Sequence, residues 1–375
     1  MANIIYISKY PPLEGGIAAK TFWLVRALAR AGHTIHVVTD PVNVDAVYSI
    51  PGSDHPPDTP SVIVHRADED VPWHIPNDNH RTISILDKTL AVISQNKPDL
   101  IVGGYLIPYG VVVFQASLIT GIPYVLLHGG SDINKFLQKN VWPNIIPKAL
   151  TAARLIISDA DNHVHISRFT DRVRILPPYV PNPAAFFLRL RRERQEFTLA
   201  LIGKANYHWR HKGWQQVVNL WCALGKEFKL LVVSQGIGLD DFKGSVPKGV
   251  RDRITWQSFV PPWKMPALLQ AVDGVFHLHN QLPFPTFSNL VLESLSCGAT
   301  VITDSACMPS SHRRHGIDLG VASAAIFQLL SDDSQAVAID LAEHLAKRDD
   351  NIPSWDCAPD FDRYVASIDE FLNTI

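Results

Sequence analysis

The amino-acid sequence predicts an α/β protein made of two Rossmann-like domains, and three observations support this prediction. Short runs rich in Val, Ile and Leu alternate with longer segments whose apolar residues recur at helical spacing. This alternation is typical of parallel sheets covered by helices on both faces. It stops near Val180 in a proline-rich segment and begins again near Thr198. A chain of 375 residues is also long enough for two or three domains.

The first half of the chain is expected to hold one parallel sheet. Residues 17–32 have the apolar spacing of a helix, with Gly32 as its C-cap. Residues 40–80 are rich in Asp, His and Pro, and we expect them to form an irregular excursion. Strands are predicted at 3–8, 34–40, 98–104, 123–130 and 153–159.

The second half repeats the pattern after a connecting segment, 176–197, that is rich in Pro and Arg. A helix is predicted at 214–227, and the last segment, 359–375, has apolar residues on one helical face and therefore needs a surface to dock on. Strands are predicted at 198–204, 229–235, 254–260, 274–280 and 299–304. The docking face is formed by Phe361, Tyr364, Val365, Ile368, Phe371 and Leu372.

The composition is that of an ordinary soluble globular protein, with 46% apolar and 19% charged residues. The formal net charge of −2 argues against a broad nucleic-acid interface. The four cysteines lack paired metal-type spacing, so neither a disulfide framework nor a zinc site is indicated. The chain shows no signal-peptide pattern, and it has no uncharged apolar run of the ~20 residues needed to span a bilayer. Both observations favour a cytoplasmic location. They are also compatible with a peripheral contact at the inner membrane face.

Gly15 and Gly16 lie in "YPPLEGGIAAK", between the first predicted strand and the first helix. Adjacent glycines let the backbone approach a ligand at a helix N-terminus. One alternative is a plain tight turn. Another is a dinucleotide-binding fingerprint in which Asp40, at the end of the second strand, would bind a ribose. The G-x-G-x-x-G pattern is absent, which disfavours the dinucleotide alternative.

His128 lies in "LLHGGSDINKF", at the end of a predicted strand. Open α/β sheets bind ligands at the carboxyl ends of their strands, so the position favours a functional histidine. Ser131 or Asp132 is suited to cap the helix that follows. The alternative is a histidine that is merely satisfied by the backbone.

A cluster of cations lies in "LIGKANYHWRHKGW", between a strand that ends near Gly203 and a helix that begins at Gly213. Cations beside a helix N-terminus form a site for phosphate. The alternative is a solvated basic loop. The cluster contains Lys204, His208, Arg210, His211 and Lys212.

The stretch "FPTFSNLVLESLSCGATVITD" contains a glutamate within an otherwise apolar segment. A helix over 289–297 places Asn289 and Glu293 on one face. The backbone amides of Ser288, Asn289 and Leu290 are then helix-start donors. Such a face suits a nucleotide diphosphate, because the amides take the anion and the carboxylate takes the ribose hydroxyls. The alternative is that Glu293 points to solvent.

These four sites, in this order, resemble the retaining glycosyltransferases of the GT-B fold, close to glycosyltransferase family 4. "HGGSD" resembles the family's H-G-S-D segment, "IGK…HKGW" its phosphate clamp, and "FSNLVLESLSCGATVITD" the second half of its E-x7-E region. The resemblance covers nearly the whole chain. It implies two Rossmann-like domains facing each other across a cleft: an acceptor domain at 1–185, a nucleotide-sugar domain at 186–355, and a helix at 356–375 that crosses back to the first domain.

The resemblance also implies roles for single residues. His128 would face the reacting sugar, and Lys204 and Lys212 would hold the diphosphate, so these three are the expected catalytic residues. Gly15 and Gly16 would lie against the donor phosphate. The remaining donor-binding residues would be Phe287, Ser288, Asn289, Leu290 and Glu293. The family uses no metal and no cofactor, since the nucleotide-sugar is a substrate.

The implied function is that of a retaining glycosyltransferase in polysaccharide or glycoconjugate biosynthesis. It would transfer a sugar from a nucleotide-diphosphate sugar to a hydroxyl of a glycan, a lipid-linked or a small-molecule acceptor. Pro285 stands where the family has the first glutamate of E-x7-E, and Lys204 stands where it has arginine. The alternatives are therefore a catalytically silent GT-B protein that binds a nucleotide or a partner, and a GT-B sugar-nucleotide epimerase.

Two weaker patterns involve metal-type residues. Asp159-Ala160-Asp161 imitates the D-x-D of metal-using glycosyltransferases, but such triplets are common by chance. The pairs His163/His165 and His277/His279 have strand spacing and no evident third ligand, so we expect ordinary sheet residues.

Overall fold

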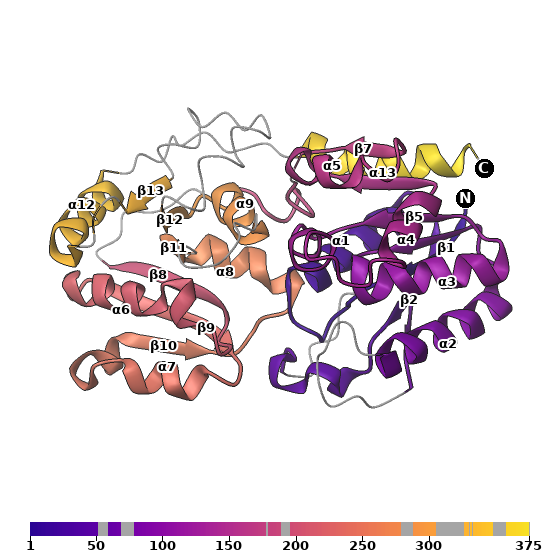
Figure 1. The fold of residues 1–375 in the computed structure, drawn as a ribbon. Helices are drawn as coiled ribbons and strands as arrows, with labels where there is room; N and C mark the ends of the chain where they lie inside the picture. The colour runs from indigo at the N-terminus through magenta and orange to yellow at the C-terminus, as the bar shows by residue number, and fades with distance from the viewer. Residues whose placement is uncertain are drawn as a thin grey trace. The chain divides into compact units, whose positions relative to one another are not determined.

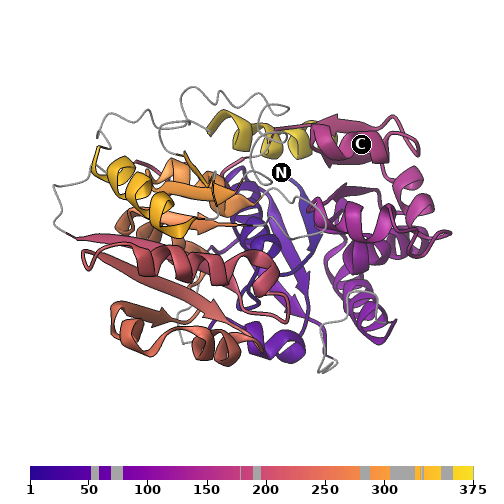
Figure 2. The ribbon, with the colours of Figure 1, turned by 60° about the vertical axis from the view of Figure 1, so that its left-hand side comes forward.

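The computed structural model divides the chain into two compact units. Unit 1 comprises Met1–Pro181 and Pro359–Ile375, and unit 2 comprises Asn182–Ala358. Each unit contains one parallel sheet with helices against both of its faces (Figure 1, Figure 2). The structure describes residues 1–51, 59–68, 79–177, 179–188, 196–278, 288–304, 326–329, 331, 333–347 and 358–374.

Unit 1 is built on a seven-stranded sheet with the order β3-β2-β1-β4-β5-β6-β7. The central strand β1 is parallel to both neighbours, so that Ile4 pairs with Ile35 on one side and with Leu100 on the other. All three side chains are fully buried, as expected for a parallel strand covered on both faces. The strands are β1 (Asn3–Ile7), β2 (Thr34–Thr39), β3 (Val62–Arg66), β4 (Leu100–Gly103), β5 (Tyr124–Leu127), β6 (Leu155–Ser158) and β7 (Val173–Ile175).

The helices of unit 1 connect these strands. The first helix ends at Arg30 with Ala31 as its C-cap, and Gly32 follows in the left-handed region at φ +99°. The helices are α1 (Gly16–Arg30), α2 (Asn79–Asn96), α3 (Val111–Thr120), α4 (Ile146–Ala152), α5 (Ala160–Ile166) and α13 (Ala358–Leu372), and the shorter turns are η1 (Val42–Tyr48), η2 (Leu106–Gly110) and η3 (Ile133–Leu137).

The last helix, α13, belongs to unit 1 and packs through the face that the sequence indicates. Phe361, Tyr364 and Ile368 are buried. The ring of Tyr179 lies 5.6 Å from that of Phe361 and 3.9 Å from that of Tyr364. Its polar contacts are His33 Nε2 with Asp369 at 2.7 Å and Arg174 with Glu370 at 2.6 Å.

Unit 2 is built on a six-stranded parallel sheet with the order β10-β9-β8-β11-β12-β13. Its core contains the buried aromatic residues Trp209, Trp214, Trp221, Phe228 and Phe242. The strands are β8 (Phe197–Lys204), β9 (Phe228–Gln235), β10 (Ile254–Gln257), β11 (Gly274–His277), β12 (Thr300–Asp304) and β13 (Ile326–Leu329). The helices are α6 (Trp214–Ala223), α7 (Leu239–Ser245), α8 (Met265–Ala271), α9 (Asn289–Ser296) and α12 (Ser334–Ala346), with turns η4 (Arg210–Lys212), η5 (Lys248–Arg253) and η6 (Pro262–Lys264).

The structure corrects two expectations about unit 1. The segment 40–80 is not wholly irregular, because it contains η1 and the edge strand β3. The strand was not predicted because Ile63 and Val64 are both exposed, so its sequence has no alternation of buried and exposed residues. His163 and His165 lie in the helix α5 and not in a sheet. Residues two apart on a helix do not share a face, so this pair has no common ligand direction.

Two further strands, β7 and β13, were not expected. Both are edge strands of three or four residues, too short to show a period. Across the described ranges, no helix combines the length and the apolar character required to cross a bilayer.

Candidate functional site

Gly15 and Gly16 open the first helix of unit 1 directly after the loop that follows β1. Gly15 is the N-cap of α1 with φ 140°, a conformation that side chains rarely adopt. No side chain caps this helix start, and its first turn holds no acidic residue. Gly16 is exposed, and a Cβ placed there would meet nothing within 4 Å. The helix start is therefore open to an anion, as the sequence suggests.

His128 follows β5, and both of its ring nitrogens have protein partners. Nδ1 accepts the backbone N–H of Gly130 at 3.1 Å, and Nε2 lies 2.8 Å from Ser158 Oγ. The Ser158 hydroxyl donates to the carbonyl of Asp159 at 3.1 Å, so Ser158 accepts from His128. This chain of bonds selects the neutral imidazole with its proton on Nε2.

Asp132 ties the loop after β5 to the loop after β4. Its buried carboxylate accepts the backbone N–H groups of Gly129 at 3.0 Å, Ile133 at 3.2 Å and Leu106 at 2.9 Å. Asp132 is therefore the cap that the sequence suggested as one of two choices. Burial raises the pKa of Asp132, although the backbone donors lower it in part.

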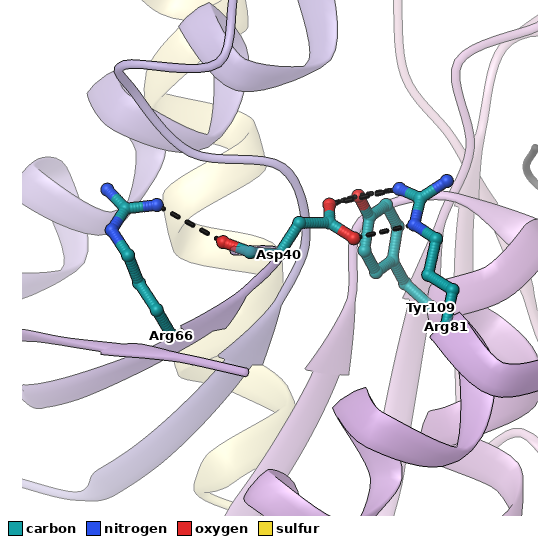
Figure 3. A network of polar contacts seen from close by, with 4 residues as sticks. All are labelled: Asp40, Arg66, Arg81 and Tyr109. Carbon is teal, nitrogen blue, oxygen red and sulfur yellow. Dashed lines mark hydrogen bonds and ion pairs between the residues drawn. The ribbon is translucent and has the colours of Figure 1, made fainter. Parts of the chain in front are cut away.

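Asp40 is fully buried at the end of β2, and its carboxylate forms an ion pair with an arginine (Figure 3). Arg81 binds both carboxylate oxygens, with Nε at 2.6 Å and a terminal nitrogen at 3.0 Å, and Tyr109 also donates to the carboxylate. Burial alone raises the pKa of Asp40, but Arg81, Lys9 and Tyr109 outweigh it and hold the pKa below its ordinary value. Asp40 is thus unavailable to a ribose, which argues against the dinucleotide alternative.

Lys204 and Lys212 lie together at the carboxyl end of β8 in unit 2. Lys204 is the last residue of the strand, and Lys212 Nζ donates to its backbone carbonyl at 2.9 Å. Gly213 follows in the left-handed conformation, with φ +68°, and begins α6 as its N-cap. The ammonium of Lys212, the end of β8 at Lys204 and a helix start therefore lie together, which is an arrangement suited to phosphate.

The loop between the two lysines is held from the neighbouring helix α7. The Arg210 guanidinium binds both oxygens of Asp241, at 2.7 and 3.1 Å, and Trp209 Nε1 donates to the same carboxylate at 3.0 Å. The indole of Trp209 is buried, while Arg210 lies over its ring at 4.2 Å. Arg210 is thereby neutralised, in contrast to its expected part in a cluster of phosphate-binding cations. The contact was missed because Asp241 lies 31 residues away in the sequence.

Helix α9 carries the predicted donor-binding face. Ser288 is its N-cap without a side-chain cap bond, and Asn289 and Leu290 begin the first turn half-buried. Glu293 is 6% exposed, which rules out the alternative that it points to solvent. Because α9 connects the parallel strands β11 and β12, its N-terminus lies at the carboxyl end of the sheet, where β8 also ends. The structure therefore brings Ser288, Asn289 and Lys204 to the same edge of unit 2.

Several residues that the sequence indicates lie outside the described residues. They are Phe287, the position of the missing glutamate at Pro285, and His279. Asp159, of the D-x-D-like triplet, is described and caps α5 by accepting the backbone N–H of Asn162 at 2.8 Å. Among the described residues there is no cluster of three or more His, Cys, Asp or Glu that could hold a metal ion.

Known proteins share this architecture. Residues 15–172 match a family model described as "Glycosyl transferase 4-like domain". Sucrose-phosphate synthase from Thermosynechococcus elongatus superposes with a TM-score of 0.73 and 16% identity, over 100% of this chain and 99% of that chain. The fold is GT-B. No curated protein matches the sequence.

Two further solved structures agree with this assignment. Anabaena Alr3699/HepE in complex with UDP and glucose has a TM-score of 0.66 and 14% identity, with 100% of each chain covered. WaaG, a glycosyltransferase involved in lipopolysaccharide biosynthesis, has a TM-score of 0.58 and 16% identity, over 100% of this chain and 95% of that chain. The predicted fold and the resemblance to GT-B glycosyltransferases are confirmed.

Proposed function

We propose that the protein is a retaining glycosyltransferase that moves a sugar from a nucleoside-diphosphate sugar to an acceptor hydroxyl. The observation that carries the proposal is the edge of unit 2, to which the fold brings Lys204, Lys212, the starts of α6 and α9 and, on α9, the buried Glu293. The GT-B neighbour bound to UDP and glucose supports a nucleotide-sugar as the donor.

In the proposed reaction the bond between the anomeric carbon and the diphosphate oxygen breaks, and a bond to the acceptor oxygen forms on the same face. The acceptor proton passes to the departing diphosphate. Lys204 and Lys212 stabilise the negative charge that develops on this leaving group. Electrostatic stabilisation of this kind needs no metal ion, so we propose that the transfer is metal-independent. We also propose that the protein is cytoplasmic, a location compatible with a peripheral contact at the inner membrane face.

The neutral state of His128 restricts its part in this reaction. Since Nδ1 accepts from Gly130 and Nε2 donates to Ser158, the ring holds its proton and is no general base in this arrangement. We propose that His128 positions the loop at the end of β5 against the sugar, and that the leaving diphosphate takes the acceptor proton.

The donor site is tested by calorimetric titration with UDP. Glu293→Ala should weaken UDP binding roughly 10- to 150-fold, because a hydrogen bond to a charged group is lost. Glu343→Ala is the matched control, since Glu343 is an exposed glutamate of the same unit that pairs with Lys347 on α12. Unchanged UDP affinity in a folded Glu293→Ala protein would remove Glu293 from the site.

Turnover is tested by release of UDP from UDP-sugars in the presence of an acceptor. Lys212→Ala should lower turnover strongly, while Lys229→Ala, which removes an exposed lysine paired with Glu196, should not. Activity that a chelator abolishes and manganese restores would contradict the metal-independent mechanism.

The proline at position 285 affects which donor sugar the protein can bind. Proline has neither a carboxylate nor an N–H, so it cannot replace the hydroxyl contacts of the family's glutamate. We propose a donor whose sugar lacks a hydroxyl at that point, such as a deoxysugar, and a panel of nucleotide-sugars tests this. A clear preference for glucose would contradict the deoxysugar proposal. UDP binding without turnover for any donor would favour the catalytically silent alternative, and conversion of the nucleotide-sugar without an acceptor would favour the epimerase.

A further inference from the structure

The carboxyl ends of β1, β2 and β4 meet at the point where the connections of the unit 1 sheet change direction. From β1 the chain passes through α1 to β2 on one side, and β4 lies on the other side of β1. Open α/β sheets bind ligands at such a point. The network around Asp40 spans it, because Pro11 follows β1, Asp40 follows β2 and Tyr109 lies in η2 after β4 (Figure 3).

Cationic side chains dominate this network within the part of the chain that the structure describes. Arg81 occupies both oxygens of the Asp40 carboxylate. Lys9, which is 8% exposed, is close enough to Asp40 to lower its pKa. Arg66 approaches from the opposite side of Asp40 (Figure 3). Arg81 and Tyr109 bind the carboxylate of Asp40, whereas Arg66 faces its backbone carbonyl on the other side.

Arg66 differs from Arg81 in what it binds. Its two terminal nitrogens donate to backbone carbonyls, that of Asp40 at 3.3 Å and that of Pro11 at 2.6 Å. These bonds use two of the five donors of a guanidinium. Among the described residues no carboxylate lies within ion-pair distance of Arg66, and the side chain is half-buried. Two carbonyls hold the guanidinium in place without neutralising its charge.

A fixed, partly exposed guanidinium with remaining donors is suited to an oxyanion, which it can bind through two parallel bonds. We propose that Arg66 binds an anionic group of the acceptor, a phosphate or a carboxylate, at this edge of unit 1. The proposal rests on the proposed function only in assigning that anion to the acceptor. The anion site itself is a property of unit 1 and is separate from the diphosphate site of unit 2.

The test is calorimetric titration of the full-length protein with inorganic phosphate. All titrations are done in the Lys212→Ala background with excess UDP, so that phosphate does not report on the donor site. Arg66→Gln should weaken phosphate binding at least about tenfold. Arg168→Gln is the matched control, because Arg168 is an exposed arginine of unit 1 that also donates to a backbone carbonyl, that of His165 at 3.0 Å. Arg168→Gln should leave phosphate affinity unchanged.

Arg66→Lys serves as the second variant in case Arg66→Gln fails to fold. It keeps the charge but loses the paired donors, so phosphate binding should fall to an intermediate level. Competition by acetate at comparable concentration assigns the site to carboxylates, and phosphate binding without such competition assigns it to phosphates. Equal phosphate affinity in the parent protein and both Arg66 variants would overturn the proposal, even if UDP binds unit 2 as proposed. Conversely, failure of UDP to bind the protein with Lys212 intact would contradict the proposed function and leave the Arg66 result interpretable.

Discussion

Replacement of Arg81 by methionine removes the cation from a buried ion pair and leaves the Asp40 carboxylate in the interior of unit 1. The two side chains are 1% and 0% exposed, and their closest approach is 2.6 Å. At an effective dielectric constant of about 20, such a contact is worth roughly 6 kcal/mol before the cost of removing both charges from water. That cost is several kcal/mol for each ion, so the pair itself contributes little net stability. The single substitution is different, because the desolvation of Asp40 remains without its compensation.

Arg81→Met should therefore lower the free energy of unfolding by about 3–5 kcal/mol. For a unit of this size, that corresponds to a fall in melting temperature of roughly 6–20 °C. Differential scanning calorimetry of the full chain at pH 7 measures the change in melting temperature. The double variant Asp40→Asn/Arg81→Met removes both charges and should be more stable than Arg81→Met alone, since no uncompensated charge stays buried.

The pH dependence of the same variant provides a second check. Because the folded pKa of Asp40 lies below its ordinary value of 3.8, the ion pair contributes fully above that pH and is lost as the pH falls through the lower folded value. In Arg81→Met, burial without the cation raises the pKa of Asp40, so the difference between the parent protein and the variant should be largest at high pH and shrink once the pH falls through that raised pKa. A loss under about 1 kcal/mol at pH 7, or a double variant that loses the sum of both single effects, would refute the reasoning.

Three further predictions follow from contacts elsewhere. His36 and His65 share a 3.0 Å contact between ring nitrogens, and burial lowers both pKa values, so the unfolding free energy in urea should fall as pH drops below about 6.5, less steeply in His65→Gln. Ser158→Ala should shift the ¹⁵N resonances of the His128 ring and lower turnover without changing UDP affinity. Ser158→Thr keeps the hydroxyl and should restore the ring resonances and the turnover. Unchanged ring resonances in Ser158→Ala would argue against the selected tautomer. Gly213→Ala should lower the melting temperature, because the residue has φ +68° and a Cβ would come within 2.8 Å of a neighbouring side chain, whereas an unchanged melting temperature would show that the turn can relax.

The sequence by itself determined the elements whose pattern is local. Buried parallel strands read as continuous apolar runs and α1 reads as an amphipathic repeat, because both depend on neighbours within a few residues. The helix around Glu293 was predicted in the same way, but the sequence left open whether this carboxylate points to solvent, and the tertiary structure decided that it is buried. The two-domain α/β fold followed from the order of these elements along the chain.

The edges of the sheets were not predictable in this way. The strands β3, β7 and β13 are short or half-exposed, so burial imposes no alternation on their sequences. His163 and His165 were placed on a strand because the segment 160–166 is too short to distinguish the two periods, whereas the tertiary structure shows a helix capped by Asp159.

Only the tertiary structure decided which polar groups meet. Asp40 is separated from Arg81 by 41 residues, His128 from Ser158 by 30, and Arg66 from Pro11 by 55. Each contact joins segments at or after the ends of different strands, and parallel strands bring such segments to one edge of the sheet whatever their distance along the chain. A sequence pattern records the periodicity that a strand or helix imposes on its own residues, but a hydrogen bond between two strand ends imposes no spacing at all. For this reason the sequence indicated where the candidate sites lie, and the fold determined that Asp40 is already neutralised while the charge of Arg66 is not.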